Sequence, residues 1–414
     1  MLNKFLSLLL ISIGLASANA ADPWPAFRGP DGDGVVRPSR SLPVEWSPTK
    51  NIAWRTEVPG EGWSSPVIGG GKVYLTAAIA RDDSDIFDLS LLIFDVQSGQ
   101  LEKTIAVMEQ TDDRPARIHK KNSHASPTPV LADDRIYVHF GYQGTAAIGR
   151  DGEIIWVNRE LYFNPTHGNG GSPLLVGDRL IFTCDGGKSP SIVALETETG
   201  KLAWQTPRPV DARKTFSFCT PSLIEVDGQQ QVIAPGSDCV LALDPQTGRV
   251  IWDVRYDGYS VVPKPVYHRG LVFVSTSFDN ANLLAIDPTG HGEVTESKVQ
   301  WRLDRNIPKT PSMVAHDGLI YSISDDGIAM CVDAESGEIV YRRRIGGGFS
   351  ASPLLAGGYL YFTSEDGETT VVKTGRKFEE VAVNDLGERT LASPAVVGEA
   401  ILLRTAEALY RIEP

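Results

Sequence analysis

Short apolar segments separated by polar turns run along most of the chain. Residues 354–367 are typical: an apolar pair (Leu354 and Leu355) is followed by a glycine turn, an alternating segment from Leu360 to Phe362, and a polar turn that ends in Gly367. Apolar positions with a period of two, bounded by turns rich in Gly and Asp, are typical of β-hairpins rather than helices. The pattern therefore predicts an all-β protein made of many short strands.

The same order of strands and turns repeats along the chain. Each unit begins with a Ser/Thr-Pro step before an apolar strand, and the steps are Ser65-Pro66, Ser126-Pro127, Ser172-Pro173, Thr220-Pro221, Thr310-Pro311, Ser352-Pro353 and Ser393-Pro394. Lys264-Pro265 fills the gap before Thr310, and from Pro127 onward the units recur every 41–48 residues. This period is typical of propeller blades. We expect an eight-bladed β-propeller of four-stranded antiparallel blades.

The turn after the third strand of a unit carries the most specific motif. Two full copies are Val193 to Trp204 and Leu241 to Trp252, in which an acidic residue, a Thr-Gly pair and a Trp recur at fixed spacing. On this motif the chain resembles the PQQ-like (pyrroloquinoline quinone repeat) β-propeller family, which includes secreted BamB-like repeat proteins. In such a turn Gly takes a left-handed conformation and the Trp packs on the neighbouring blade. The predicted docking residues are Trp54, Trp156, Trp204, Trp252, Trp301, Gly200, Gly248 and Gly337.

The two ends of the repeat array complement each other. The last unit, Ser393 to Ile412, has three strands and no Trp-bearing fourth strand, whereas Asn51 to Thr56 looks like an isolated fourth strand. We expect this N-terminal strand to complete the last blade, which would close the ring and remove its open edges. The propeller would then span residues 51–414, preceded by an irregular arm over residues 21–50.

The first 20 residues predict export. Lys4 precedes a short apolar run from Phe5 to Leu15, and Ala18-Asn19-Ala20 is a small-x-small cleavage site. These are the parts of a secretory signal peptide, so we expect residues 1–20 to be removed and the protein to be periplasmic or secreted. No later segment is apolar and long enough to predict a transmembrane span.

Charge and cysteine content narrow the classes of partner. The net charge of −13 disfavours nucleic acid as a partner, because phosphates would be repelled. Cys184, Cys219, Cys239 and Cys331 match no zinc motif. In an oxidising compartment Cys219 and Cys239 could pair, and buried free thiols are the equal alternative. We expect a monomer that binds an unknown protein or small-molecule ligand.

Polar and aromatic residues converge on one mouth of the predicted ring. The residues before each inner strand and those in the turn after the second strand should surround a funnel, as should Phe216, Phe218 and Tyr259. Such a concave mouth favours a ligand site. The candidate ligand-binding residues are Asn122, His124, His167, Asn169, Lys309 and Arg389.

No catalytic motif is recognised, so the sequence favours a non-enzymatic function. The chain has no Gly-x-Ser-x-Gly elbow, His-Glu-x-x-His motif or P-loop, and its Asp31–Gly34 and Asp82–Asp85 runs lack the spacing of an EF-hand. The resemblance implies two classes: scaffold propellers, and quinoprotein dehydrogenases that hold PQQ with calcium. The adjacent cysteines and the calcium ligands of many quinoproteins have no counterpart here. We expect an exported binding scaffold; the alternatives are a PQQ-dependent alcohol or sugar oxidoreductase and a glycan-binding propeller.

Overall fold

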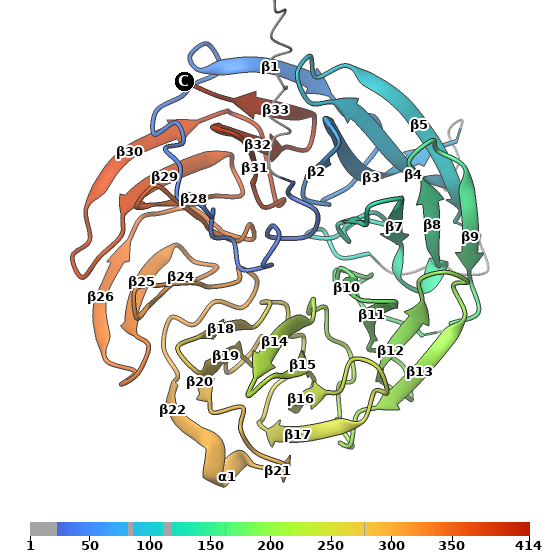
Figure 1. Cartoon of the computed structure of the whole chain (residues 1–414). Coiled ribbons are helices and arrows are strands. Elements are labelled where there is room, and N and C mark those ends of the chain that lie inside the picture. Colours follow the sequence, from blue (N-terminus) through green and yellow to red (C-terminus); the bar gives the residue numbers. More distant parts are fainter. Residues whose placement is uncertain (1–22, 82–85, 111–117, 162, 277) are drawn as a thin grey trace, which may run out of the picture.

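The computed structural model describes residues 23–81, 86–110, 118–161, 163–276 and 278–414. In this part of the chain, eight sheets are arranged around a central axis (Figure 1). The prediction of an all-β, eight-bladed propeller with four-stranded antiparallel sheets is therefore confirmed. The predicted signal peptide, residues 1–20, lies outside the described residues.

The first four blades follow one another along the chain, each with its inner strand first. Their strands are β2 (Val67–Gly69), β3 (Lys72–Ala80), β4 (Phe87–Asp95) and β5 (Leu101–Glu109) in blade 1; β6 (Val130–Leu131), β7 (Arg135–His139), β8 (Thr145–Gly149) and β9 (Ile154–Asn158) in blade 2; β10 (Leu174–Val176), β11 (Arg179–Cys184), β12 (Ser191–Glu196) and β13 (Leu202–Pro207) in blade 3; and β14 (Ser222–Val226), β15 (Gln229–Gly236), β16 (Cys239–Leu243) and β17 (Val250–Arg255) in blade 4.

The last four blades continue in the same order. Their strands are β18 (Val266–His268), β19 (Leu271–Ser275), β20 (Leu283–Ile286) and β22 (Val299–Leu303) in blade 5; β23 (Val314–His316), β24 (Leu319–Ile323), β25 (Ile328–Asp333) and β26 (Ile339–Arg344) in blade 6; β27 (Leu354–Ala356), β28 (Tyr359–Thr363), β29 (Glu368–Lys373) and β30 (Glu380–Asp385) in blade 7; and β31 (Ala395–Val397), β32 (Ala400–Arg404) and β33 (Ala408–Ile412) in blade 8, which β1 (Ile52–Glu57) joins.

One blade departs from four antiparallel strands. The segment between β20 and β22 contributes β21 (Gly292–Glu293), which pairs in parallel with β17 and gives blade 4 a fifth strand. It is followed by a single helical turn, α1 (Thr295–Lys298). In the described residues, the other helical element is the 3-10 turn η1 (Gly141–Gln143). The repeat pattern gave no sign of this added strand, because the strand is only two residues long.

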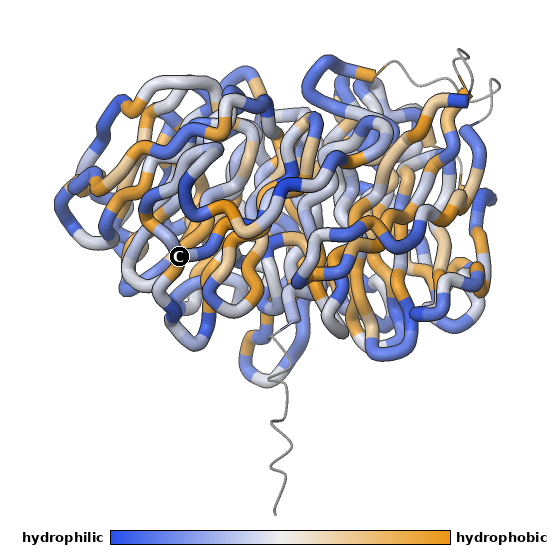
Figure 2. The backbone as a smooth tube through the Cα atoms, turned by 90° about the horizontal axis from the view of Figure 1, so that it is seen from above, coloured by the Kyte–Doolittle hydropathy of each residue, from blue (hydrophilic) through white to orange (hydrophobic). Residues whose placement is uncertain are grey.

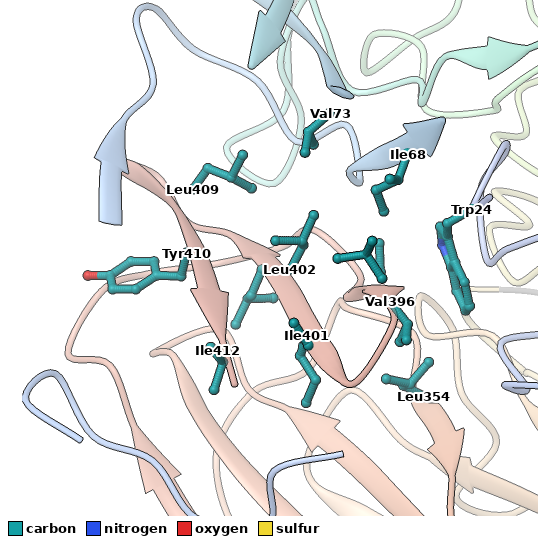
Figure 3. Close-up of a cluster of buried hydrophobic side chains, with 14 of the residues drawn as sticks. Trp24, Ile68, Val73, Leu354, Val396, Ile401, Leu402, Leu409, Tyr410 and Ile412 are labelled. Carbon is teal, nitrogen blue, oxygen red and sulfur yellow. The ribbon is translucent and has the colours of Figure 1, made fainter. Parts of the chain in front are cut away.

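The N-terminal strand lies in the sheet of the last blade. β1 pairs antiparallel with β33, so that Arg55 faces Tyr410, and the order of this sheet is β1-β33-β32-β31. The Arg55 guanidinium also donates to Glu388 at 2.8 Å. Figure 3 shows the apolar side chains under this seam, where Leu402 and Leu409 of blade 8 lie near Val73 of blade 1.

Apolar side chains fill the spaces between neighbouring blades. Seen edge-on in Figure 2, hydrophobic stretches run through the body of the disc and hydrophilic stretches gather in the loops of both faces. The buried core residues fall into several clusters that each join two or more blades. This interior distribution follows from the period of two in the strands.

A chain of hydrogen bonds circles the axis where the inner strands begin. In seven of the eight steps a backbone N–H donates to the Ser or Thr hydroxyl of the next blade, at 2.9–3.1 Å. We call the seven hydroxyl-bearing residues the axial ring: Ser65, Thr128, Ser172, Thr220, Ser312, Ser352 and Ser393. Blade 5 instead places Lys264 at this position, and Lys264 contributes its backbone N–H to the chain of bonds.

The axial ring corrects the predicted start of two units. Blade 2 contributes Thr128, and blade 6 contributes Ser312. Both lie two residues after the predicted steps at Ser126-Pro127 and Thr310-Pro311. One residue separates each of them from the inner strand that follows, β6 or β23. The sequence pattern gave the wrong start because a Ser/Thr-Pro step lies two residues before the residue that joins the axial ring in each of these blades.

Four docking turns are held by their own backbone and by a tryptophan from the preceding blade. The amides of Gly99, Gly200, Gly248 and Gly337 each donate to the carbonyl four residues earlier at 2.9 Å. The indole N–H groups of Trp54, Trp156, Trp204 and Trp301 donate to carbonyls of the next blade's turn at 2.9–3.3 Å. The fifth predicted docking residue, Trp252, differs: its indole donates to Gln231 of its own blade at 2.8 Å.

The N-terminal arm, residues 23–50, crosses the axis and contacts several blades (Figure 1). Trp24 forms a β-bridge with Ile68, and Val35 forms one with Leu355. The Leu131 amide donates to the Pro25 carbonyl at 2.8 Å. These three contacts lie toward the far ends of the inner strands of blades 1, 7 and 2, opposite the axial ring. The arm thus covers the other end of the central channel.

Candidate functional site

A cavity of about 1210 Å³ opens at the mouth of the ring where the inner strands begin. Its wall is made by residues that precede the inner strands and by turns between second and third strands, as the sequence predicted. The seven hydroxyl-bearing residues of the axial ring line it, and Phe27 of the arm lies at its inner end. We call this cavity the funnel, the axial ring its throat, and the arm its floor.

Aromatic rings line one side of the funnel in an unbroken row. The rings of His119 and His167 meet edge to face with centroids 5.6 Å apart, His167 meets Phe216 at 5.2 Å, and Phe216 meets Tyr259 at 5.6 Å. Phe278 extends the aromatic wall and is 52% exposed. Edge-to-face contacts hold such rings in place, so the wall is a preformed surface on which a flat or apolar ligand could stack.

Lysine side chains lie among these rings. The Lys214 ammonium lies over the Tyr259 ring, 3.6 Å from its centroid, and the Lys309 ammonium lies 5.2 Å from the centroid of Phe278. Both lysines line the funnel. A cation over an aromatic face is attracted by the ring quadrupole, which keeps the positive charge close to the wall.

Two of the carboxylates that line the funnel, Asp325 and Asp279, are engaged by protein donors. Asp325 accepts hydrogen bonds from the amides of Lys309 and Thr310 and from the Thr310 hydroxyl, at 2.6–3.2 Å. Asp279 accepts from the Tyr259 hydroxyl at 2.6 Å. These bonds fix the wall residues that carry them.

One ion pair joins opposite parts of the mouth. Lys121, before blade 2, lies 2.6 Å from Glu365 of blade 7. Burial alone would raise the pKa of Glu365, but the hydrogen bonds from Lys121 and Ser350 hold it below its ordinary value. At neutral pH the carboxylate is therefore ionised, and the pair holds residues 118–122 over part of the mouth.

Three of the predicted ligand-binding residues line the funnel. Asn122, His167 and Lys309 all belong to its wall. The Asn122 side-chain amide donates to the His167 carbonyl at 2.9 Å, so the loops before blades 2 and 3 are tied together. The structure therefore brings these three residues into one cavity from separate blades.

The other three predicted residues lie outside the lining of the funnel. His124 packs against Phe87 at 5.1 Å, and burial lowers its pKa. Asn169 is buried and donates to the Gly171 carbonyl at 3.4 Å. Arg389 lies over the Trp63 ring at 5.1 Å and donates to the Lys120 carbonyl at 3.1 Å. Of the three, Arg389 lies beside the mouth, because its partner Trp63 belongs to the lining.

Among the lining residues that were not predicted are Phe27, Trp63, Lys214 and Phe278. Trp63 and Lys214 could have been found, since each lies just before an inner strand. Phe278 could also have been found, because it adjoins Asp279 in a second-to-third-strand turn. Phe27 could not, because the non-repeating arm carries no signal of where it crosses the ring.

The described residues offer no evident metal centre. Among them, no three His, Cys, Asp or Glu side chains form a group that could hold a metal ion. Asp31 and Asp33 both bond to Arg37, at 3.0 and 2.7 Å, and Asp82–Asp85 lie outside the described residues. Cys184, Cys219, Cys239 and Cys331 are all buried free thiols, so the structure contains the unpaired alternative. No helix in the described residues is long and apolar enough to span a membrane.

The sequence matches one family model. The model described as outer membrane protein assembly factor BamB matches residues 102–298 and 280–414, which together cover most of the chain. No curated protein matches the sequence significantly.

Solved structures of similar fold include BamB and several dehydrogenases. BamB from Moraxella catarrhalis is 14% identical, with a TM-score of 0.59 over 87% of this chain and 99% of that chain. Quinohemoprotein alcohol dehydrogenase from Comamonas testosteroni is 14% identical, with a TM-score of 0.70 over 96% of this chain and 81% of that chain. A europium-containing methanol dehydrogenase is 11% identical, with a TM-score of 0.60 over 94% of this chain and 90% of that chain. At such identities the likeness shows the fold alone.

Proposed function

Because the chain belongs to the family of BamB-like, PQQ-repeat β-propellers, we propose that it is an exported binding protein whose ligand site is the funnel. The observation that carries this proposal is the convergence of an aromatic wall and two lysines in a cavity with a floor. The proposal narrows the expected scaffold to one that takes a small ligand.

The size and form of the funnel support a small ligand rather than a flat protein surface. Its volume of about 1210 Å³ is somewhat above the ~300–1,000 Å³ of ordinary small-molecule sites. The exposed face of Phe278 and the edges of Phe216 and Tyr259 offer apolar contact. The hydroxyls, amides and lysines between them offer directional hydrogen bonds, which is the usual composition of a ligand pocket.

The test is a thermal-shift screen of the mature protein against oligosaccharides, aromatic carboxylic acids and PQQ. A ligand that binds only the folded state raises the Tm by mass action. We expect at least one class to bind, and Phe278→Ala to weaken that binding about tenfold, which corresponds to ~1.4 kcal/mol of lost contact. Phe216→Ala should act in the same direction.

The matched control is Tyr267→Ala in β18. Tyr267 is an aromatic residue of the same blade as Phe278, is 38% exposed, and is absent from the lining of the funnel. This variant should bind like the wild type. If no compound shifts the Tm, or if Phe278→Ala binds every compound unchanged, the small-ligand proposal fails and a protein partner takes its place.

A calcium-anchored quinone does not fit the described funnel residues. The donor set of such a site would need clustered carboxylate and amide oxygens, yet among the described residues no three His, Cys, Asp or Glu side chains form a group that could hold a metal ion. Asp325 and Asp279 also already accept hydrogen bonds from protein donors. The buried, separate cysteines offer no adjacent pair beside a ligand. PQQ is therefore tested as a ligand only.

The oxidoreductase alternative has its own test. Adding calcium to the titration with PQQ should leave the Tm shift unchanged, and the protein should not oxidise alcohols or sugars with an artificial electron acceptor. A saturable shift that needs calcium, together with dye-linked activity, would replace the binding proposal with the quinoprotein one.

A further inference from the structure

The throat of the funnel is lined by hydroxyl groups whose protons the ring itself does not use. Each of the seven oxygens accepts a backbone N–H from the preceding blade. A hydroxyl that accepts one bond still has its own O–H to donate. Because all seven residues also line the cavity, the throat presents hydrogen-bond donors around the axis.

Two buried cations lie at the same level as the throat or next to it. Lys264 occupies the eighth position of the ring, is 5% exposed, and donates through its ammonium to the Gly32 carbonyl of the arm at 2.9 Å. Arg28 of the arm is 2% exposed and donates to the carbonyl of Met313, the residue after Ser312 of the ring, at 2.7 Å. Both cations therefore border the axial ring from the side of the floor.

These cations are only partly compensated. The Nε and Nη1 atoms of Arg28 are buried and have no hydrogen-bond partner among the described residues. The acidic group that acts on both cations is Asp33, and it already bonds to the Val35 amide and to Arg37. A buried charge without full hydrogen bonding is costly, and a bound anion would offset that cost.

We propose that the throat binds the anionic group of the ligand, a carboxylate, sulfate or phosphate. Its oxygens accept hydrogen bonds from ring hydroxyls, and the charges of Lys264 and Arg28 attract it. The inference rests on the proposed function in placing the rest of the ligand against the aromatic wall. It assigns the ligand class as anionic compounds with an apolar or aromatic body.

The experiment is a calorimetric titration with inorganic sulfate at constant ionic strength, with chloride as the balancing ion. The main variant is Lys264→Ser, which removes the charge and supplies the hydroxyl that this ring position lacks. Sulfate affinity should fall at least tenfold in Lys264→Ser. The control Lys373→Ser removes a lysine on the outer part of blade 7 that pairs with Glu379, and its sulfate affinity should match the wild type.

A second variant separates the hydroxyls from the charge. Thr220→Val keeps the shape of the side chain and removes the hydroxyl that lines the funnel and accepts the Ser172 amide. It should weaken sulfate binding while the purified protein retains the far-UV spectrum of the wild type. Crystals soaked in selenate should show an anomalous peak on the axis at the throat; a peak elsewhere, or none, would overturn the inference.

Parallel titrations distinguish the source of the anion and the two proposals. If the anion is the carboxylate of an aromatic compound, benzoate affinity depends on both Phe278 and Lys264, while affinity for sulfate or phosphate depends on Lys264 and not on Phe278. Ligand binding that requires Phe278 but is unchanged in Lys264→Ser, with no sulfate binding, rejects the throat inference and keeps the proposed function. If sulfate binding depends on Lys264 but no compound of the ligand screen binds, the throat inference is kept and the small-ligand proposal is rejected.

Discussion

At the axis, Lys264 stands where the other seven blades carry Ser or Thr. Burial lowers its pKa from 10.5 to about 8, and the positive charge of Arg28 acts in the same direction, while Asp33 and Cys219 oppose it. The charged form of this side chain is thus less favourable in the folded state than in the unfolded chain. Its cost is offset in part by the bond to the Gly32 carbonyl.

This shift predicts a pH dependence of stability. Between about pH 8 and 10.5 the unfolded chain keeps the Lys264 proton while the folded protein has lost it, so the free energy of unfolding should rise with pH in this window. Lys264→Ser should lack that rise. Urea unfolding of both proteins at pH 7 and pH 10, in chloride buffers, measures the difference. If the free energy of unfolding changes with pH equally in the two proteins, the pKa of Lys264 is not lowered in the folded state.

Single residues were predictable from the sequence only where the repeat determines them. Asn122, His167 and Lys309 lie in the funnel because each adjoins an inner strand, which the repeat locates. Arg28 also approaches the axis, yet its position depends on an arm that shares no motif with the blades. Side-chain partners across hundreds of residues, such as Arg28 with Met313, leave no local pattern.

Among the elements, the docking turns show how strongly the blades depend on glycine. At Gly248 the backbone has φ of +70°, and an added Cβ would lie 2.5 Å from the Trp204 ring. Gly228, in the turn between β14 and β15, has φ of +78° with no atom within 4 Å of such a Cβ. The two glycines therefore share the backbone conformation and differ in their surroundings.

Alanine at each position should separate these two effects. Gly228→Ala should cost roughly 1–2 kcal/mol from the left-handed conformation alone. Gly248→Ala should cost a further ~1–3 kcal/mol, because Trp204 must move. Urea unfolding of the two variants measures the gap, and equal losses of stability would mean that the indole contact is unimportant for holding blades 3 and 4 together.

The sequence predicted the kind and number of elements better than their register. The Thr-Gly motif located the third turn in blades 3 and 4, where Gly200 and Gly248 take the expected conformation. In blades 2 and 6 the predicted start was a Ser/Thr-Pro step that lies two residues before the residue of the axial ring. The β21 addition to blade 4 was missed since parallel pairing of two residues has no periodicity.

On the scale of the whole molecule, the seam between β1 and β33 joins the ends of the ring without a covalent link. Trp54 crosses from this seam to blade 1, where its indole donates to the Val96 carbonyl at 3.3 Å. Trp156 makes the equivalent contact between blades 2 and 3, donating to the Thr197 carbonyl at 2.9 Å. The difference lies in how each outer strand is joined to its own blade: a turn links β9 to β8, whereas β1 is joined to β33 by pairing alone.

Loss of Trp54 should therefore loosen a larger region than loss of Trp156. In Trp54→Ala, amide exchange should accelerate in β1 and in β31 to β33, because β1 is held to blade 8 by pairing alone. In Trp156→Ala the acceleration should stay within blades 2 and 3. Native-state hydrogen exchange measures both, and the same pattern in the two variants would argue against a special role for the seam.

The ring as a whole was accessible from the sequence, and its closed end was not. Eight repeats imply a central channel and one mouth lined by the approaches to the inner strands. The arm becomes the floor through contacts such as Trp24 with Ile68, which link a non-repeating segment to a blade. Long-range packing of that kind is set by shape and burial rather than by local sequence.

Since the arm closes one end of the channel, whatever binds in the funnel arrives and departs through the same opening. Residues 118–122 narrow that opening through the Lys121–Glu365 pair and the Arg389 bond to Lys120. A narrower passage slows association and dissociation by the same factor. We therefore expect the Lys121–Glu365 pair to lengthen the residence time of a bound molecule, in addition to any contacts that His119 and Asn122 make with it.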